Sequence, residues 1–171
     1  TTGEWFNTTC ANCGLFSIQT STGTDRQLYL SGGNVCTDLY NGGRETLCSA
    51  GVNFADGQWH HALHVIGAGG HSLYLDGVLH ATGIKTSSSF GATGEVFLGY
   101  APNAAQPYLT GTLDQVQMFA STLTDLEARG VYQSWAAAPL QNSGNGVTST
   151  NWSATVPKDL EGQFQIDLTA T

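Results

Sequence analysis

Apolar and polar residues alternate along most of this chain in short runs that glycine-rich turns separate. The pattern is clearest over residues 54–77, where two Asp-Gly pairs bracket two alternating segments joined by a glycine-rich turn at residues 67–70. Alternation with a period of two is typical of β-strands, and Asp-Gly pairs favour tight turns. We therefore predict a β-hairpin here. The face that we expect to point into the core carries Trp59, His61, Leu63 and Val65.

The same pattern predicts further strands on both sides of this hairpin. They are expected near residues 4–9, 14–20, 26–31, 34–40, 44–49, 78–83, 95–100 and 109–119. Many short strands with tight turns favour an all-β fold with two packed antiparallel sheets. The side chains that we expect to be mostly buried are Trp5, Phe16, Leu28, Leu30, Trp59, Leu63, Leu73, Leu75, Phe97, Leu113 and Val116.

One short helix is predicted near residues 124–130. Thr124 and Glu127 form a capping box, in which the threonine side chain accepts a hydrogen bond from the amide three residues on and the glutamate bonds back. Gly130 is expected to end the helix. Residues 131–137 are then interpreted as a closing strand that buries Trp135.

The chain changes character after Pro139, so we divide it into a sandwich over residues 1–138 and a C-terminal piece over residues 139–171. The C-terminal piece opens with a polar linker and continues with two strand-like runs, of which the second has one strongly apolar face. That face carries Phe164, Ile166, Leu168 and Ala170. A two-stranded hairpin is at best marginally stable alone. We therefore expect residues 151–170 to dock on a free sheet edge, within their own chain or by strand exchange with another copy.

Composition narrows the class of partner. Charged residues make up 11% of the 171 residues, the formal net charge is −8, and the five lysines and arginines are scattered. No basic patch is present to release counterions from nucleic acid, so neither nucleic acid nor an anionic membrane is expected as a partner. No apolar run reaches the roughly 18 residues that a membrane span needs. We expect a soluble fragment, with any signal peptide outside it.

The four cysteines indicate an oxidising compartment. Cys36 and Cys48 flank the turn at residues 41–43 symmetrically, so a hairpin centred there brings them opposite each other. Cys10 and Cys13 lie between two predicted strands, where a disulfide would close a short loop. Four cysteines allow three pairings, and sequence does not choose among them. A zinc site built from all four is the alternative, although the second pair lacks the close spacing of zinc knuckles.

The histidines and acidic residues form no recognisable catalytic motif. His60, His61 and His64 superficially resemble the HExxH zinc motif, but the glutamate is missing and a strand holds His60 and His64 roughly 13 Å apart. We interpret His61 as a hydrogen-bonded core or rim residue and His60 as a surface residue. A retaining glycosidase needs two carboxyl groups about 5 Å apart. The nearest acidic pairs lie in a helix cap and a turn, and they are Asp125 with Glu127 and Asp159 with Glu161. No enzymatic activity is expected.

Five blocks, in order, resemble the laminin G-like (concanavalin A-like) jelly-roll family. They are Asp56-Gly-Gln-Trp-His-His61, Leu73-Tyr-Leu-Asp-Gly77, Val96-Phe-Leu-Gly99, Leu109-Thr-Gly-Thr-Leu-Asp114-Gln-Val-Gln-Met-Phe119 and Leu123-Thr-Asp-Leu-Glu-Ala128. The resemblance implies a two-sheet antiparallel jelly roll. Family members usually have a strand before the one at residues 4–9, so we expect a free sheet edge that the C-terminal hairpin complements. The C-terminal piece also resembles the opening strands of immunoglobulin-like repeats, so a truncated next domain is the alternative.

The resemblance also implies function. It predicts a secreted or cell-surface, non-catalytic module that binds a glycan or an extracellular protein, and the alternative is a structural spacer without a ligand of its own. Tyr100, Asn103 and Tyr108 are the candidate ligand-binding residues, because rings and amides suit a sugar. Family members often carry one calcium ion, and Asp114 is the candidate ligand, with a turn-capping role as the alternative. Asp76 is similar in kind, but its Asp-Gly turn already accounts for it.

Overall fold

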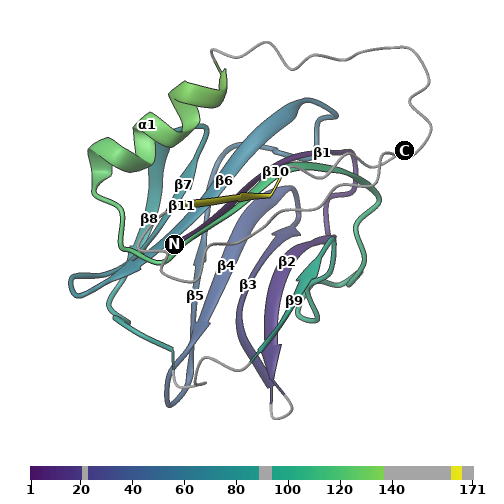
Figure 1. Ribbon diagram of the computed structural model, residues 1–171. Coiled ribbons are helices and arrows are strands. Elements are labelled where there is room, and N and C mark those ends of the chain that lie inside the picture. The colour runs from purple at the N-terminus through teal and green to yellow at the C-terminus, as the bar shows by residue number, and fades with distance from the viewer. Residues whose placement is uncertain (21–22, 89–93, 137–162, 167–171) are drawn as a thin grey trace.

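The computed structural model describes residues 1–20, 23–88, 94–136 and 163–166, and it contains two facing antiparallel sheets and one helix (Figure 1). The six-stranded sheet has the order β11-β10-β1-β6-β7-β8. Its strands are β1 (Thr2–Thr8), β6 (Trp59–Gly67), β7 (Gly70–Leu75), β8 (Val78–Gly83), β10 (Gly111–Phe119) and β11 (Gln163–Ile166). The five-stranded sheet has the order β5-β4-β3-β2-β9. Its strands are β2 (Gly14–Thr20), β3 (Gly23–Ser31), β4 (Asn34–Tyr40), β5 (Arg44–Cys48) and β9 (Glu95–Leu98). The predicted jelly-roll sandwich is confirmed.

The main apolar cluster of the core lies between the two sheets and draws on both of them. It consists of Phe6, Leu15, Phe16, Leu28, Leu30, Val35, Leu47, Phe54, Ala62, Leu73 and Leu75. A second cluster lies on the outer face of the six-stranded sheet, under helix α1 (Asp125–Ala136). It consists of Leu63, Val65, Tyr74, Phe119, Leu123 and Ala128. The six-stranded sheet is therefore buried on both faces where the helix covers it (Figure 1).

This second cluster corrects the predicted orientation of β6. Leu63 and Val65 pack under the helix, whereas Ala62 and His64 point between the sheets. Both faces of the strand are apolar enough to be buried, so alternation alone could not tell one layer from the other. Three of the residues that we expected to be buried are also corrected. Trp59 and Leu113 are only partly buried, and Phe97, on the edge strand β9, is 36% exposed.

Helix α1 begins as predicted and ends later. Glu127 accepts hydrogen bonds from the backbone amide of Thr124 at 2.7 Å and from its hydroxyl at 2.8 Å, so the capping box is present. The predicted end at Gly130 and the strand at residues 131–137 are wrong, because the helix continues to Ala136. A helical glycine costs about 1 kcal/mol, which the packing of Ala128 and Val131 onto the second cluster offsets. Residue 137 and the side chain of Trp135 lie outside the described residues.

The C-terminal piece does reach the sandwich, at least in part. Strand β11 pairs antiparallel with β10 from Val116↔Ile166 to Phe119↔Gln163, so residues 163–166 dock within their own chain, as one form of the prediction has it. The edge that they extend is that of β10, because β1 is already paired on both sides, by β10 and by β6. Residues 151–162 and 167–170, and the predicted boundary at residues 138–139, lie outside the described residues.

Candidate functional site

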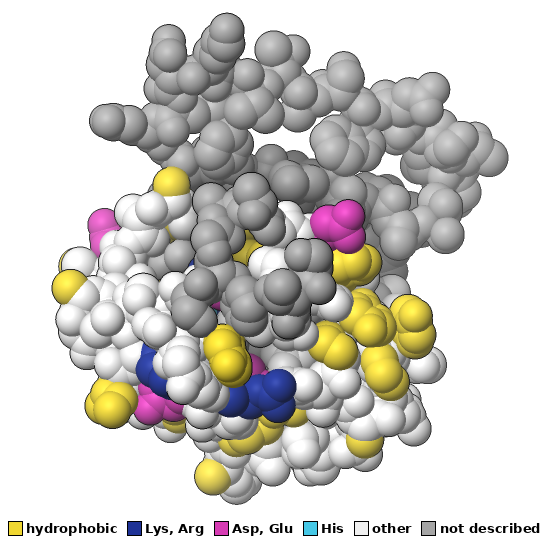
Figure 2. Space-filling view, turned by 90° about the horizontal axis from the view of Figure 1, so that it is seen from below, with side chains coloured by type: hydrophobic (Ala, Val, Ile, Leu, Met, Phe, Trp, Pro, Cys, Tyr) yellow, Lys and Arg dark blue, Asp and Glu magenta, His cyan; other side chains and the backbone are white. Residues whose placement is uncertain are grey.

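Three aromatic rings gather at the β9 edge of the five-stranded sheet, and we call Phe97, Tyr100 and Tyr108 the aromatic cluster. The rings of Tyr100 and Tyr108 have centroids 4.9 Å apart and are tilted by 49°, and that of Phe97 lies 5.6 Å from Tyr100. Tyr108 is 73% exposed. Apolar side chains gather on the right of the face shown in Figure 2, with an acidic side chain beside them. The structure thus brings together two of the three predicted ligand-binding residues and adds Phe97.

The aromatic cluster is held by the segment that joins β9 to β10. Tyr100 and Tyr108 form an isolated antiparallel bridge, and the amide of Ala101 donates to the carbonyl of Pro107 at 2.9 Å. We call residues 99–108 the aromatic loop. It is a closed loop whose two ends carry the tyrosines side by side.

The aromatic loop rests on the segment before β2, which contains the first disulfide. The amide of Gln106 donates to the carbonyl of Asn12 at 3.0 Å, and the amide of Gly14 donates to the carbonyl of Gln106 at 3.2 Å. The side-chain Oε1 of Gln106 lies 3.1 Å from Cys10 Sγ. A Cβ on Gly14 would overlap the backbone of the aromatic loop at Ala101 and Pro107, so only glycine permits this approach.

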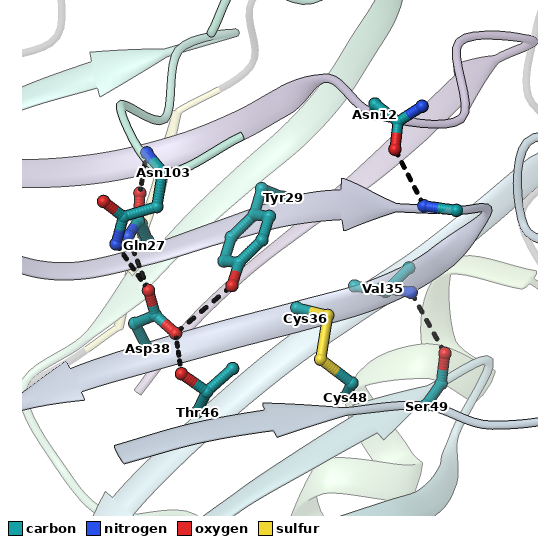
Figure 3. The surroundings of a disulfide bond; sticks show 11 residues. Asn12, Gln27, Tyr29, Val35, Cys36, Asp38, Thr46, Cys48, Ser49 and Asn103 are labelled. Atoms are coloured by element: carbon teal, nitrogen blue, oxygen red, sulfur yellow. Dashed lines mark hydrogen bonds between the residues drawn. A yellow bond between two sulfur atoms is a disulfide. The ribbon is translucent and has the colours of Figure 1, made fainter. Parts of the chain in front are cut away.

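A buried carboxylate fixes the middle of the aromatic loop to the sheet (Figure 3). Asp38 Oδ2 accepts from Asn103 Nδ2 at 2.6 Å and from Gln27 Nε2 at 2.7 Å. Asp38 Oδ1 accepts from Thr46 Oγ1 at 2.6 Å and from the hydroxyl of Tyr29 at 3.4 Å. Burial, and then the charge of Asp38, raise the pKa of Tyr29 to about 12. The side-chain amide of Asn103, which the sequence grouped with the two tyrosines, is therefore engaged with Asp38 inside the protein.

Both cysteine pairs are disulfides, Cys10 with Cys13 and Cys36 with Cys48. The second bond crosses between β4 and β5 at directly opposite positions, with the Cα atoms 4.1 Å apart (Figure 3). The prediction of disulfides and of this pair is confirmed, and the zinc alternative for the four cysteines is wrong. Cys36 also packs against Tyr29, Ala101 and Ala104 beneath the aromatic loop.

The histidines of the central hairpin are used inside the protein. His61 is buried against the rings of Trp5 and Tyr132, which also stack on each other, and neither of its ring nitrogens has a hydrogen-bond partner among the described residues. Burial lowers its pKa to about 4. The predicted burial is confirmed, and the predicted hydrogen bonding is wrong. His60, expected at the surface, lies with its ring nitrogens 2.8 Å from Asp76 and 3.1 Å from Asp56.

His64 belongs to a polar chain that crosses the core from sheet to sheet. Its Nδ1 lies 2.9 Å from the hydroxyl of Thr37, and its Nε2 lies 3.0 Å from Nδ1 of His71. His71 Nε2 lies 2.9 Å from Glu45, which also accepts hydrogen bonds from the amides of residues 84 and 85. Burial lowers the pKa of His64 well below its usual value and lowers that of His71 as well. We call Thr37, His64, His71 and Glu45 the core polar chain.

Asp114, the candidate calcium ligand, lies next to a bulge in β10. Its carboxylate accepts a hydrogen bond at 2.8 Å from the amide of Gln115, which has a positive φ of 50°. Calcium takes six to eight oxygen ligands. Within the described residues, no group of three or more His, Cys, Asp or Glu side chains could hold a metal ion. The local geometry therefore fits the turn-capping alternative, and calcium binding stays a prediction.

The chain matches the family model of the concanavalin A-like lectin/glucanases superfamily over residues 1–129. The chain belongs to this superfamily. Similar solved structures include the CBM40 of the IT-sialidase from Ruminococcus gnavus bound to α2,3-sialyllactose, with 22% identity, a TM-score of 0.61, and 77% of this chain and 80% of that chain covered. No curated protein matches the chain.

Two further solved structures have a similar fold. A SAP-like pentraxin from Limulus polyphemus is 18% identical, with a TM-score of 0.58 over 77% of this chain and 68% of that one. Domains LG4-5 of the mouse laminin α1 chain are 13% identical, with a TM-score of 0.59 over 72% and 36%. These similarities support the fold described for this chain. In the described part of the chain, no helix is long and apolar enough to cross a membrane.

Proposed function

We propose that this superfamily member is a non-catalytic, extracellular module that binds carbohydrate at the aromatic cluster. The observation that carries the proposal is the exposure of Tyr108, a residue that is 73% exposed and whose ring lies beside that of a second tyrosine. Tyrosine combines an apolar face with a polar hydroxyl, and a sugar ring presents C–H groups on its faces and hydroxyls at its rim. Exposed aromatic groups held in a fixed arrangement mark binding sites.

The construction of the aromatic loop supports a binding role. Backbone hydrogen bonds to the segment of the first disulfide and the anchor at Asp38 hold the loop from two sides. A rigid site loses less conformational entropy when a ligand binds, so it binds more tightly for the same contacts. The solved CBM40 structure bound to sialyllactose supports a glycan as the class of ligand, through its shared fold.

The remaining features are consistent with a secreted module that lacks catalytic carboxylates. Two disulfides in one small domain suit an oxidising compartment. Of the acidic pairs considered for catalysis, Glu127 serves the helix cap, and Asp125 pairs with Arg129 at 3.1 Å. Asp159 and Glu161 lie outside the described residues.

A glycan array followed by calorimetric titration of the best ligand tests the proposal. Tyr108→Ala is expected to weaken binding by about thirtyfold, which corresponds to the roughly 2 kcal/mol of an aromatic hot spot. Tyr40→Ala is the matched control, because Tyr40 is a partly exposed tyrosine on β4, outside the aromatic loop. Silence across a broad array, or equal effects of the two substitutions, would contradict the proposal, and silence would favour the spacer role.

The same titration tests the predicted calcium ion. It is run with calcium and with a chelator, on the wild type and on Asp114→Asn. Calcium-dependent binding that this substitution removes would establish Asp114 as a ligand. Equal affinities in all four measurements would show that binding needs no calcium.

A further inference from the structure

The segments that surround the aromatic cluster lack positive charge. Strand β2 and residues 94–110, which include β9 and the aromatic loop, contain no lysine, arginine or histidine. Their single charged residue is Glu95, which is exposed. Glu95 precedes Phe97 by two positions on β9, so both side chains point to the same face of the sheet.

The four described lysine and arginine side chains contact residues outside β2, β9 and the aromatic loop. Arg26 pairs in register with Ile18, which packs against the core, so Arg26 points to the inner side, and it binds Asp25 at 3.0 Å. Arg44 lies on β5, four strands and about 19 Å from β9. Its side chain reaches the buried anchor of the aromatic loop, where its Nε lies 3.6 Å from Asp38 Oδ2 and its charge is paired with that carboxylate.

The other two described basic residues lie on different elements. Lys85 donates to the carbonyl of Asn41 at 2.7 Å, and Arg129 pairs with Asp125 on α1. None of the four described basic residues belongs to β2, β9 or the aromatic loop. Lys158 lies outside the described residues.

We propose that the ligand of the aromatic cluster is an uncharged glycan, and that the site discriminates against sialylated, sulfated and uronic acid forms of the same glycan. This inference rests on the proposed carbohydrate-binding function. A neutral pyranose can stack a C–H face on the rings of Tyr108 and Tyr100. An acidic sugar in the same position would bring its anion next to Glu95, and none of the described basic residues lies on β2, β9 or the aromatic loop to pair with it. The protein as a whole has a net charge of −8.

The size of the discrimination follows from Coulomb's law. Two unit charges about 8 Å apart repel weakly in a medium like bulk water and about four times more strongly at the effective dielectric constant of a protein surface. These two limits correspond to a loss of about two- to thirty-fold in affinity for the acidic glycan. The Debye length is about 8 Å at physiological ionic strength and about 3 Å at 1 M, so high salt should reduce the difference.

The experiment uses an array in which each neutral glycan is printed beside its sialylated, sulfated and uronic acid forms, followed by titration of the best-binding pair in low and high salt. Lactose and α2,3-sialyllactose form one such pair. We expect the neutral member to bind more tightly, and we expect salt to narrow the gap. Equal or tighter binding of the acidic members would overturn this inference and leave carbohydrate binding intact. Absence of binding to every glycan would instead overturn the proposed function and the inference with it.

Charge-neutral variants identify the source of the discrimination. Glu95→Gln should raise the affinity for the acidic glycan by about two- to thirty-fold and leave the neutral one nearly unchanged. Glu127→Gln is the matched control, because it removes the same charge from the exposed cap of α1 and glutamine still completes a capping box. An unchanged preference in Glu95→Gln, or an equal change in both variants, would contradict the role given to Glu95.

Discussion

Glu4 offers the sharpest test of the packing described above. It lies on β1 two positions before Phe6, opposite Ala62 of β6, so its side chain points into the core between the sheets. It is 1% exposed, and neither carboxyl oxygen has a hydrogen-bond partner among the described residues. Burial raises the pKa of Glu4 from 4.5 to about 8. The folded protein therefore holds this carboxyl in its neutral form at pH 7.

The raised pKa makes stability depend on pH with a definite sign. The folded state binds the proton more tightly than the unfolded state, so the contribution of Glu4 is fully present below pH 4.5 and is lost as pH rises to about 8. One pKa unit corresponds to about 1.4 kcal/mol. The loss is therefore on the order of 3 kcal/mol at pH 7 and approaches 5 kcal/mol above pH 8.

Glu4→Gln removes this titration and nearly preserves the shape of the side chain. Its free energy of unfolding, measured by urea denaturation from pH 4 to pH 9, should match the wild type in acid and exceed it by about 3 kcal/mol at pH 7. The control is Glu127→Gln. Hydrogen bonds from Thr124 lower the pKa of the Glu127 carboxyl in the native protein, so this variant should become less stable than the wild type as pH rises. A difference between Glu4→Gln and wild type that stays constant with pH would refute the account of Glu4.

Three further predictions concern the disulfide, the buried histidine and the C-terminal strand. Replacing both Cys10 and Cys13 with alanine should speed hydrogen exchange in the aromatic loop more than replacing both Cys36 and Cys48 does. Mass spectrometry measures the exchange, and equal protection of the loop in the two variants would contradict this. His61→Phe should flatten the acid limb of stability, because a pKa lowered from 6.5 to about 4 makes the native protein lose about 3 kcal/mol between these pH values; an unchanged limb would contradict it. Deleting residues 141–171 should lower Tm, since β10 loses its partner β11; an unchanged Tm in a monomeric product would show that the pairing adds no stability.

Local signals in the sequence were enough to predict much of the fold. The strand and turn pattern, the capping box at Thr124 and the opposition of Cys36 and Cys48 each depend on a few neighbouring residues. The superfamily blocks then gave the order of the elements. The length of α1 was missed because a glycine in a helix is tolerated when the next turn can pack, and only the tertiary structure shows that it does.

The site was predicted less completely, for a physical reason. Tyr100 and Tyr108 could be found because they flank one loop, whereas Phe97 was assigned to the core although its strand lies at the sheet edge. The anchor of Asn103 on Asp38 joins residues 65 positions apart. Gln27, a polar residue in an alternating strand, was the available signal of a buried polar contact, but the sequence does not reveal which residue it contacts.

The core polar chain has a consequence for how the two sheets align. The Glu45 carboxylate only accepts, so His71 carries its proton on Nε2, and its Nδ1 then accepts from the Nε2 proton of His64. Thr37 donates to the remaining nitrogen, and every donor in the series points toward Glu45. Apolar side chains tolerate sliding, but a one-residue slip of β6 or β7 would move a histidine to the opposite face and leave its partners buried and unbonded. The four residues thus form an ordered series of hydrogen bonds that is complete in only one register of the two sheets.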